Sequence, residues 1–415
     1  MAKLYKYPLS GFWSNIGDFG QMIPIYYGEV LPGQSMHGSA RVKIVTDSLV
    51  KIALNRMWFD MFFFYVPNRL LWSGWETFIV GGGGTVPTVG DDWEFNFEKR
   101  LPVGAGTARA AWRRYCYNFV WNNALRSHDQ AEVALSQTTP QEVLNRARSF
   151  QNQLMKDALP DETIDVSGGT LDLQELKEAQ KEYRRKRIEY FFQGPSGKEY
   201  LSMLENMGVR PGWEIDDSPR LIGQYHAQAT FETVVGTAAT NVASPSGFWA
   251  GHAEVKFGSK FFPEHGVILG VCVPRMEFAH EVAGRVHPLD QKTELSYFYT
   301  DGQRPSPPNT WSAYHAGHLA TTQVQNAPAW EDYRSSVSQM FGGFYSAGAP
   351  WDDNYFIIAK ADTSGDAWKL RSYGLQVEPD NNDFFRNFVG EGKVALASEI
   401  SGVQMNPVPP RQVNI

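Results

Sequence analysis

The feature that most constrains the fold of this chain is a change of hydrophobic period along its length. The first hundred or so residues have a β-type pattern, residues 106–208 have a helical period, and the β pattern returns after Arg220. Strands and helices do not alternate, which argues against a parallel sheet with crossover helices. We therefore expect an antiparallel double sheet with the helices inserted in one connection, because loop-closure entropy grows only with the logarithm of loop length.

Several segments read as strands. Residues 22–31 end at the turn signal Pro32-Gly33, and residues 41–50 alternate between apolar and charged side chains. Residues 57–66 are so aromatic that the strand needs cover on both faces, either from its own loops or from a neighbouring subunit. Further strands are predicted at residues 254–262, 266–275, 354–361 and 368–377.

Four helices are predicted in the middle block. The first spans residues 107–125 and buries Trp112, Cys116 and Phe119 on one face. The second opens with the capping box Thr139-Pro140-Gln141-Glu142 and continues as the apolar stripe Val143, Ala147, Phe150 and Leu154. The other two span residues 172–192 and 198–207, the last ended by Gly208. We expect a single domain over residues 1–415, with a mostly helical insertion at residues 106–210 and an extended C-terminal arm at residues 405–415.

Composition narrows the class of protein. Hydrophobic residues make up 42% of the chain, and the 13 Trp, 18 Tyr and 26 Phe suit broad β cores and protein interfaces. The net charge of −7 argues against a protein that coats nucleic acid with its whole surface. We expect no membrane span and no signal peptide, and we expect Cys116 and Cys272 to be core residues in a reducing compartment, the cytoplasm.

No motif in the sequence requires catalysis or a cofactor. Residues 81–84 are all glycine, but they lack the Lys-Ser/Thr ending of a phosphate-binding loop, so a flexible loop is expected. His315 and His318 are predicted to bind no metal, and the acidic runs at residues 352–353 and 380–383 are predicted to be turns, with an ion at a subunit contact as the alternative. His265, next to Glu264, is expected to make a structural hydrogen bond and not to act as an acid or base.

Six sequence blocks resemble the signature of the major capsid proteins of microviruses, the small icosahedral single-stranded DNA phages (Microviridae, with gokushovirus-like motifs). The first two are I-P-I-Y-Y-G-E-V-L-P-G at residues 23–33 and D-M-F-F-F-Y-V-P-N-R-L-L-W at residues 60–72. The other four follow in the family's order at residues 114–122, 219–223, 264–270 and 328–334. Such a series over most of the chain is far more specific than any one block.

The resemblance implies a fold, a function and partners. The fold is an eight-stranded antiparallel viral jelly roll with long loops and a large helical insertion. The function is structural and not enzymatic: self-assembly of about sixty copies, through pentameric intermediates, into a T=1 icosahedral capsid. The implied partners are circular single-stranded DNA inside the shell, a small basic DNA-packaging protein and other virion proteins. The resemblance also implies a virion that is assembled in the host cytoplasm.

Candidate contact residues follow from charge and aromaticity. For nucleic acid they are Lys3, Lys6 and Arg411 on the termini, alternatively arms that bind neighbouring subunits, and the basic run Arg184, Arg185 and Arg187, alternatively a solvated helix face. For subunit interfaces they are the aromatic residues Trp72, Trp75 and Phe78, the helical insertion and the C-terminal arm.

A second interpretation of the aromatic β pattern is a carbohydrate-binding or carbohydrate-active β-sandwich. Exposed Trp and Tyr would stack on sugars, and a glycosidase would need two carboxylates facing one cleft. The lack of a recognisable signal peptide counts against this alternative.

Overall fold

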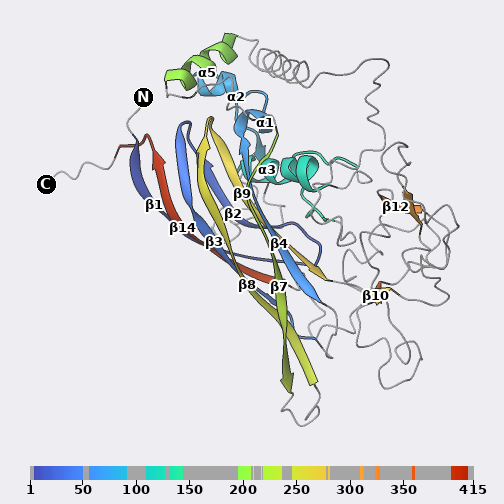
Figure 1. The fold of residues 1–415 in the computed structure, drawn as a ribbon. Helices are drawn as coiled ribbons and strands as arrows, with labels where there is room; N and C mark the ends of the chain where they lie inside the picture. Colours follow the sequence, from blue (N-terminus) through green and yellow to red (C-terminus); the bar gives the residue numbers. More distant parts are fainter. Residues whose placement is uncertain are drawn as a thin grey trace, which may run out of the picture.

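A sheet of eight long strands forms the body of the protein (Figure 1). The structure is a computed structural model that describes residues 4–49, 56–90, 109–126, 131–143, 195–206, 209, 216, 218–235, 245–276, 279–280, 309–312, 323–327, 358–359 and 394–409. The long strands are β1 (Tyr5–Gly17), β2 (Ile23–Val30), β3 (Gln34–Thr46), β4 (Met57–Pro67), β7 (Arg220–Val235), β8 (Pro245–Phe262), β9 (Gly266–Met276) and β14 (Val394–Asn406).

The remaining elements are short. The helices are α1 (Asn68–Leu71), α2 (Trp75–Ile79), α3 (Trp112–Val120), the π-turn η1 (Trp121–Leu125) and α5 (Pro195–Asn206). The short strands are β5 (Thr88–Val89), β6 (Arg109–Ala110), β10 (Ala279–His280), β11 (Asn309–Ser312), β12 (Gln323–Ala327) and β13 (Ile358–Ala359). The helices that the structure describes all follow β4 and precede β7 in the sequence.

The order of the long strands is that of a jelly roll. Neighbouring strands are hydrogen-bonded in the order β1-β14-β3-β8-β7-β4-β9-β2, and every pair is antiparallel. Residues 220–229 of β7 pair with β4, whereas residues 230–235 pair with β8, so β7 passes from one sheet to the other. The strands β1, β14, β3 and β8 thus face the strands β2, β9, β4 and β7. This double-sheet architecture confirms the predicted fold class.

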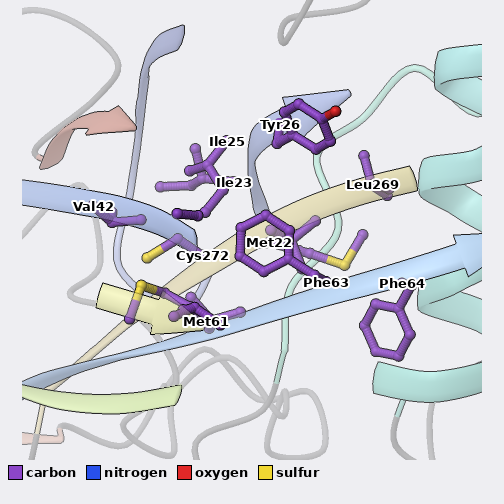
Figure 2. Close-up of a cluster of buried hydrophobic side chains, with 14 of the residues drawn as sticks. Met22, Ile23, Ile25, Tyr26, Val42, Met61, Phe63, Phe64, Leu269 and Cys272 are labelled. Atoms are coloured by element: carbon purple, nitrogen blue, oxygen red, sulfur yellow. The ribbon is translucent and has the colours of Figure 1, made fainter. Parts of the chain in front are cut away.

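The core lies between the two sheets. Phe63 of β4 packs edge-on against Phe257 of β8 with ring centroids 4.8 Å apart, and Tyr65 contacts Phe262 at 4.9 Å. Figure 2 shows part of this core, in which side chains of β2, β3, β4 and β9 gather around Met61 and Cys272. Burying one such aromatic side chain stabilises the fold by roughly 1.5–3 kcal/mol.

The aromatic strand β4 is covered on both faces, as its composition predicts. Phe64 and Val66 point away from the inter-sheet core, yet they are 1% and 0% exposed. Cys116 and Tyr117 of α3 belong to the same buried cluster, and α1 and α3 lie beside β4 and β9 in Figure 1. The cover comes from the chain's own helices, so this face of the sheet does not need a neighbouring subunit.

The outer face of the other sheet is solvated. In β3, Ala40, Val42 and Ile44 are buried while Arg41 and Lys43 are exposed, which is the alternation expected of a strand with one wet face. The strand begins at Gln34, seven residues earlier than predicted, and ends at Thr46. β2 and β4 lie where the sequence predicts them, and Gly33 adopts φ 74° in the predicted turn.

Two helix predictions need correction. α3 begins at Trp112 and not at residue 107, because Arg109 and Ala110 form a strand with β5. The capping box at residue 139 starts no helix in the described residues up to Val143: Glu142 forms a bridge with Gln21 instead. The rest of that helix and the predicted helix at residues 172–192 lie outside the described residues. The last predicted helix is confirmed as α5, which begins at Pro195.

The two ends of the chain also differ from expectation. β1 is a regular strand that includes Lys6, where a flexible terminus is predicted. β14 continues through Asn406, so the extended arm predicted from residue 405 begins no earlier than Pro407. β8 and β9 confirm the strands predicted at residues 254–262 and 266–275. The strand predicted at residues 368–377 lies outside the described residues, and of residues 354–361 only β13 is described.

Candidate functional site: the loop end of the jelly roll

The predicted interface aromatics lie just after β4, where α1 and α2 extend beyond one end of the sheets, next to α5 (Figure 1). Trp75 is 6% exposed and packs edge-on against Trp112 and His265, each with ring centroids 5.5 Å away. It forms a small cluster with Tyr200 and Leu204 of α5. Trp75 therefore holds α2, α3 and α5 together within one subunit and offers little surface to another.

Trp72 and Phe78 are more accessible than Trp75. Trp72 is half-buried between Trp112 and Phe78, with ring centroids 6.1 Å and 5.7 Å away, and Phe78 is 37% exposed. The loop at residues 81–84 follows directly, with Gly81, Gly83 and Gly84 at positive φ. Of the three predicted interface residues, Phe78 presents the most apolar surface at this end.

A buried ion pair ties α1 to the turn between β8 and β9. Arg69 donates two hydrogen bonds to the Glu264 carboxylate, Nε to Oε2 at 3.0 Å and Nη2 to Oε1 at 3.0 Å. The two side chains are 5% and 0% exposed. Such a two-bond arrangement fixes both groups in position, and each would be costly to leave unpaired in the interior.

The ion pair is part of a larger network of polar contacts, the polar joint, which also includes Tyr65, Asp216 and Arg220. Tyr65 donates its hydroxyl to the main-chain oxygen of Glu264 at 2.9 Å, and Arg69 also donates to the main-chain oxygen of Asp216 at 2.8 Å. Arg220 lies over the Tyr65 ring and forms an ion pair with Asp216 at 3.3 Å. The joint therefore connects the end of β4, the start of β7 and the β8–β9 turn, and it fixes the base from which α1 and α2 project.

His265 is packed inside this joint and is not part of an acid/base pair with Glu264. The Glu264 carboxylate is bound by Arg69, while His265 Nδ1 lies 3.5 Å from the Tyr200 hydroxyl and its main-chain oxygen accepts a hydrogen bond from Asn68 N. Burial lowers the pKa of His265 to about 4, so the ring is neutral near pH 7. These contacts support the predicted structural role.

Three of the sequence blocks meet at the joint. Asn68-Arg69, Pro219-Arg220 and Glu264-His265-Gly266 come from separate blocks, and the contacts above bring them together. The sequence analysis did not single out the Arg69–Glu264 pair. Its signal was present as one basic residue, Arg69, in the block at residues 60–72 and one acidic residue, Glu264, in the block at residues 264–270.

The sequence block at residues 114–122 binds a different segment of the chain. Arg114 of α3 is buried and donates to the main-chain oxygen of Gly90 at 2.7 Å, and Asn118 donates to that of Leu135 at 2.8 Å. Trp121 Nε1 donates to the main-chain oxygen of Glu142 at 2.9 Å. The polar side chains of this helix thus fasten residues 131–143, which have little regular structure of their own, onto the body.

A second polar cluster lies on the sheet of β4, β7 and β9. Asp60 is buried between Arg275, whose Nε is 2.8 Å from Oδ2, and His226, whose Nδ1 is 2.5 Å from Oδ1. His226 is 52% exposed at its side chain and lies beside Trp58. In the described part of the chain, no group of three or more His, Cys, Asp or Glu side chains is arranged to hold a metal ion.

The predicted nucleic-acid residues are only partly described. Lys6 lies exposed on β1, whereas Lys3, Arg184, Arg185, Arg187 and Arg411 fall outside the described residues, as do His315, His318 and the two acidic runs. Cys116 and Cys272 are both buried free thiols, as predicted, and burial raises the pKa of each. Among the described helices, none is long and apolar enough to cross a membrane.

The sequence matches to known proteins are consistent with the jelly-roll fold. Residues 3–94 match the family described as capsid protein (F protein). Capsid protein VP1 of Chlamydia phage 1 is 38% identical over 65 residues, and capsid protein VP1 of Bdellovibrio phage phiMH2K is 37% identical over 60 residues. These matches cover 16% and 14% of this chain and span only 11% of the length of each relative.

A longer match links most of the chain to a third capsid protein. Capsid protein F of Escherichia phage G4 is 23% identical over an alignment of 324 positions, and the match covers 71% of this chain and 71% of the relative. The family match at residues 3–94 includes β1, β2, β3 and β4, half of the long strands of the jelly roll. With the signature blocks and the jelly-roll strand order, these matches show that the chain is similar to the microvirus capsid proteins.

Proposed function

We propose that this chain is the major capsid protein of a small phage, a structural protein and not an enzyme, whose copies self-assemble into a T=1 icosahedral shell of about sixty subunits. The observation that carries the proposal is the family match at residues 3–94, because it falls on the first four strands of a jelly roll. The comparisons favour this function over carbohydrate binding.

The structure supports a division of labour within the subunit. The two sheets form the body of the subunit, and the buried Arg69–Glu264 pair fixes the loop end to it. The long connections then supply contacts between subunits, with the exposed Phe78 and the half-buried Trp72 as anchors at the loop end. The insertion at residues 106–210 and the arm predicted at residues 405–415 are further contact regions in this proposal.

The proposed contents of the shell are circular single-stranded DNA and a small basic packaging protein. The net charge of −7 supports the need for such a cationic partner, since the chain itself has an excess of acidic residues. Lys3, Lys6, Arg411, Arg184, Arg185 and Arg187 are the proposed phosphate contacts. Lys6 is exposed on β1, which supports its inclusion. In this proposal, other virion proteins join the shell and assembly takes place in the host cytoplasm.

Size-exclusion chromatography with light scattering on the expressed full chain, followed by electron microscopy of the largest fraction, tests this function. We expect uniform small icosahedral particles or pentamers. Adding a single-stranded circular DNA and a polycationic peptide to pentamers should increase the yield of closed particles. A stable monomer under all these conditions that also bound glycans on a panel would contradict the proposal.

A further inference from the structure

β1 forms an edge of its sheet, with β14 as its hydrogen-bonded neighbour. Two residues show which N–H and C=O groups of β1 point away from β14. Ile16 N donates to its own neighbour Asn15 Oδ1, and Pro8 has no N–H to give to a ladder. In an antiparallel pair, every second residue directs its N–H and C=O away from the partner. The residues of β1 that do so are therefore Lys6, Pro8, Ser10, Phe12, Ser14 and Ile16.

These outward residues are also the exposed ones. The burial pattern of β1 alternates without interruption from Tyr5 to Ile16, and Phe12 and Ile16 are 69% and 57% exposed. An exposed strand edge of this length is a template for pairing with another chain, and proteins usually protect it with Pro or Lys. Here Lys6 and Pro8 protect only the first part of the strand. The segment from Ser10 to Ser14 has no described main-chain partner on its outer side.

The sequence of the outward residues reads nearly the same in both directions around Phe12. Ser10 and Ser14 lie two positions away on either side, and the apolar residues Pro8 and Ile16 lie four positions away. A two-fold axis at Phe12 would place β1 antiparallel to the β1 of another copy. It would bring Phe12 against the partner's Phe12, Ser10 against the partner's Ser14, and Pro8 against the partner's Ile16. Such self-complementarity is what an isologous contact between identical chains requires.

The positions of charged residues on either side of Phe12 also fit this two-fold register. Six positions before Phe12 lies Lys6, and six positions after it lies Asp18. The two-fold axis would therefore bring Lys6 toward the partner's Asp18 at both ends of the contact. Next to Phe12 in the sheet, the acidic Glu399 of β14 lies opposite Arg41 of β3 in the strand register. Arg41 forms its ion pair with Glu254 of β8 at 3.8 Å, and its position next to Glu399 also places a positive charge near the two Glu399 carboxylates at the axis.

We propose that β1 joins two copies of this chain edge to edge across a two-fold axis at Phe12, extending the β1-β14-β3-β8 sheet from one subunit into the next. This inference deepens the proposed assembly function, on which it rests, by assigning one of the contacts between subunits. Main-chain hydrogen bonds from Ser10, Phe12 and Ser14 supply the affinity, and the Phe12 pair supplies an apolar centre. Pro8 limits the length of the ladder at each end.

Engineered disulfides test the register directly in the assembled full chain. Residues in a hydrogen-bonded antiparallel pair have Cα atoms about 5.5 Å apart, within the range that a disulfide spans. Phe12→Cys should therefore form a covalent dimer on mild oxidation. Ser10→Cys alone should not, because the two Ser10 positions lie about 13 Å apart along the strands. Mixing Ser10→Cys with Ser14→Cys protein should restore the covalent dimer. The native thiols, Cys116 and Cys272, are buried and give no background.

The outcomes separate this inference from the proposed function. Particles that crosslink through Phe12→Cys and through the Ser10/Ser14 mixture, but not through Ser10→Cys alone, support the two-fold contact. Particles that form but crosslink with another pattern or not at all overturn the contact and leave the capsid function standing. Failure to form any particle or oligomer, with no crosslink, overturns both.

A backbone variant gives an independent readout. Phe12→Pro removes an outward N–H without removing a bond to β14, as Pro8 already does in the same strand. We expect its subunit to unfold at nearly the same temperature while its yield of particles falls at least tenfold. Phe12→Val, which keeps the N–H and has a strand-forming side chain, is the matched control and should retain most of the yield. Equal particle yields for the two variants would overturn the edge contact.

Discussion

Arg69 and Glu264, 195 residues apart in the sequence, form a buried ion pair with two hydrogen bonds, and this pair fixes the loop end of the jelly roll to its body. Removing one partner leaves the other charged and unpaired in the interior. We expect Arg69→Met to lower the free energy of unfolding by about 3 kcal/mol, a typical cost for breaking a buried pair. Urea unfolding of the subunit, followed by tryptophan fluorescence, measures the change.

The double variant Arg69→Met with Glu264→Leu is the control for that prediction. It removes both charges, so it should be markedly more stable than either single variant. Additive losses in the double-mutant cycle would show that the two side chains do not interact energetically.

His265 should make stability depend on pH. In the unfolded chain it protonates near 6.5, whereas burial lowers its pKa in the fold to about 4. Between these values the unfolded state binds more protons, so the contribution of the neutral ring is complete above pH 6.5 and decreases as pH falls toward 4. We expect the fall in unfolding free energy over this interval to be about 2 kcal/mol smaller in His265→Gln than in the parent chain.

Trp75 and Phe78 should respond differently to truncation. Trp75 is buried against Trp112 and His265, so Trp75→Ala should destabilise the subunit by about 3–5 kcal/mol. Phe78→Ala should change subunit stability by less than about 1 kcal/mol, because its side chain is already partly in water, yet it should reduce the yield of particles. Thermal unfolding and light scattering on the same samples separate the two effects. Normal assembly of Phe78→Ala would remove this residue from the set of contacts.

The two thiols should be unreactive in the folded subunit. Cys116 and Cys272 are both buried, and burial raises the pKa of each thiol, so neither access nor ionisation favours reaction. A thiol reagent such as Ellman's reagent should therefore modify neither cysteine without denaturant and both in urea. Modification of one thiol per chain under native conditions would contradict this burial.

Much of the sheet was predictable from local patterns. β2, β4, β9 and the second half of β8 are confirmed, because each is an apolar or alternating run, and β2, β4 and β8 stop at a proline or within two residues of one. β1 was harder to identify, because Pro8 and Gly11 interrupt its alternation and its partner, β14, lies at the other end of the chain. The capping box that begins at Thr139 led to the opposite error, in which a predicted element does not form in the described residues up to Val143. The local signal favours a helix, but Glu142 is drawn into a bridge with Gln21 and Tyr117 accepts a hydrogen bond from Gln141 N.

The candidate site also has features that the sequence predicts and features that only the structure reveals. Aromatic residues near β4 were recognisable as contact candidates, but the sequence does not distinguish Trp75, which packs inside the subunit, from Phe78, which is exposed. That distinction depends on where α5 lies, since Tyr200 and Leu204 form part of the cluster around Trp75. The burial of Trp75 depends on residues far away in the chain, so the sequence around Trp75 does not reveal it.

The sequence by itself determined the strand-rich class, the signature blocks and the alternating faces of residues 41–46, because alternation and turn chemistry act between near neighbours in the chain. Only the tertiary structure decided which strands pair, that Arg69 meets Glu264, and that β1 is left with one edge open. Those outcomes depend on contacts between residues far apart in sequence, where a buried charge must find its partner and each strand must find its neighbour.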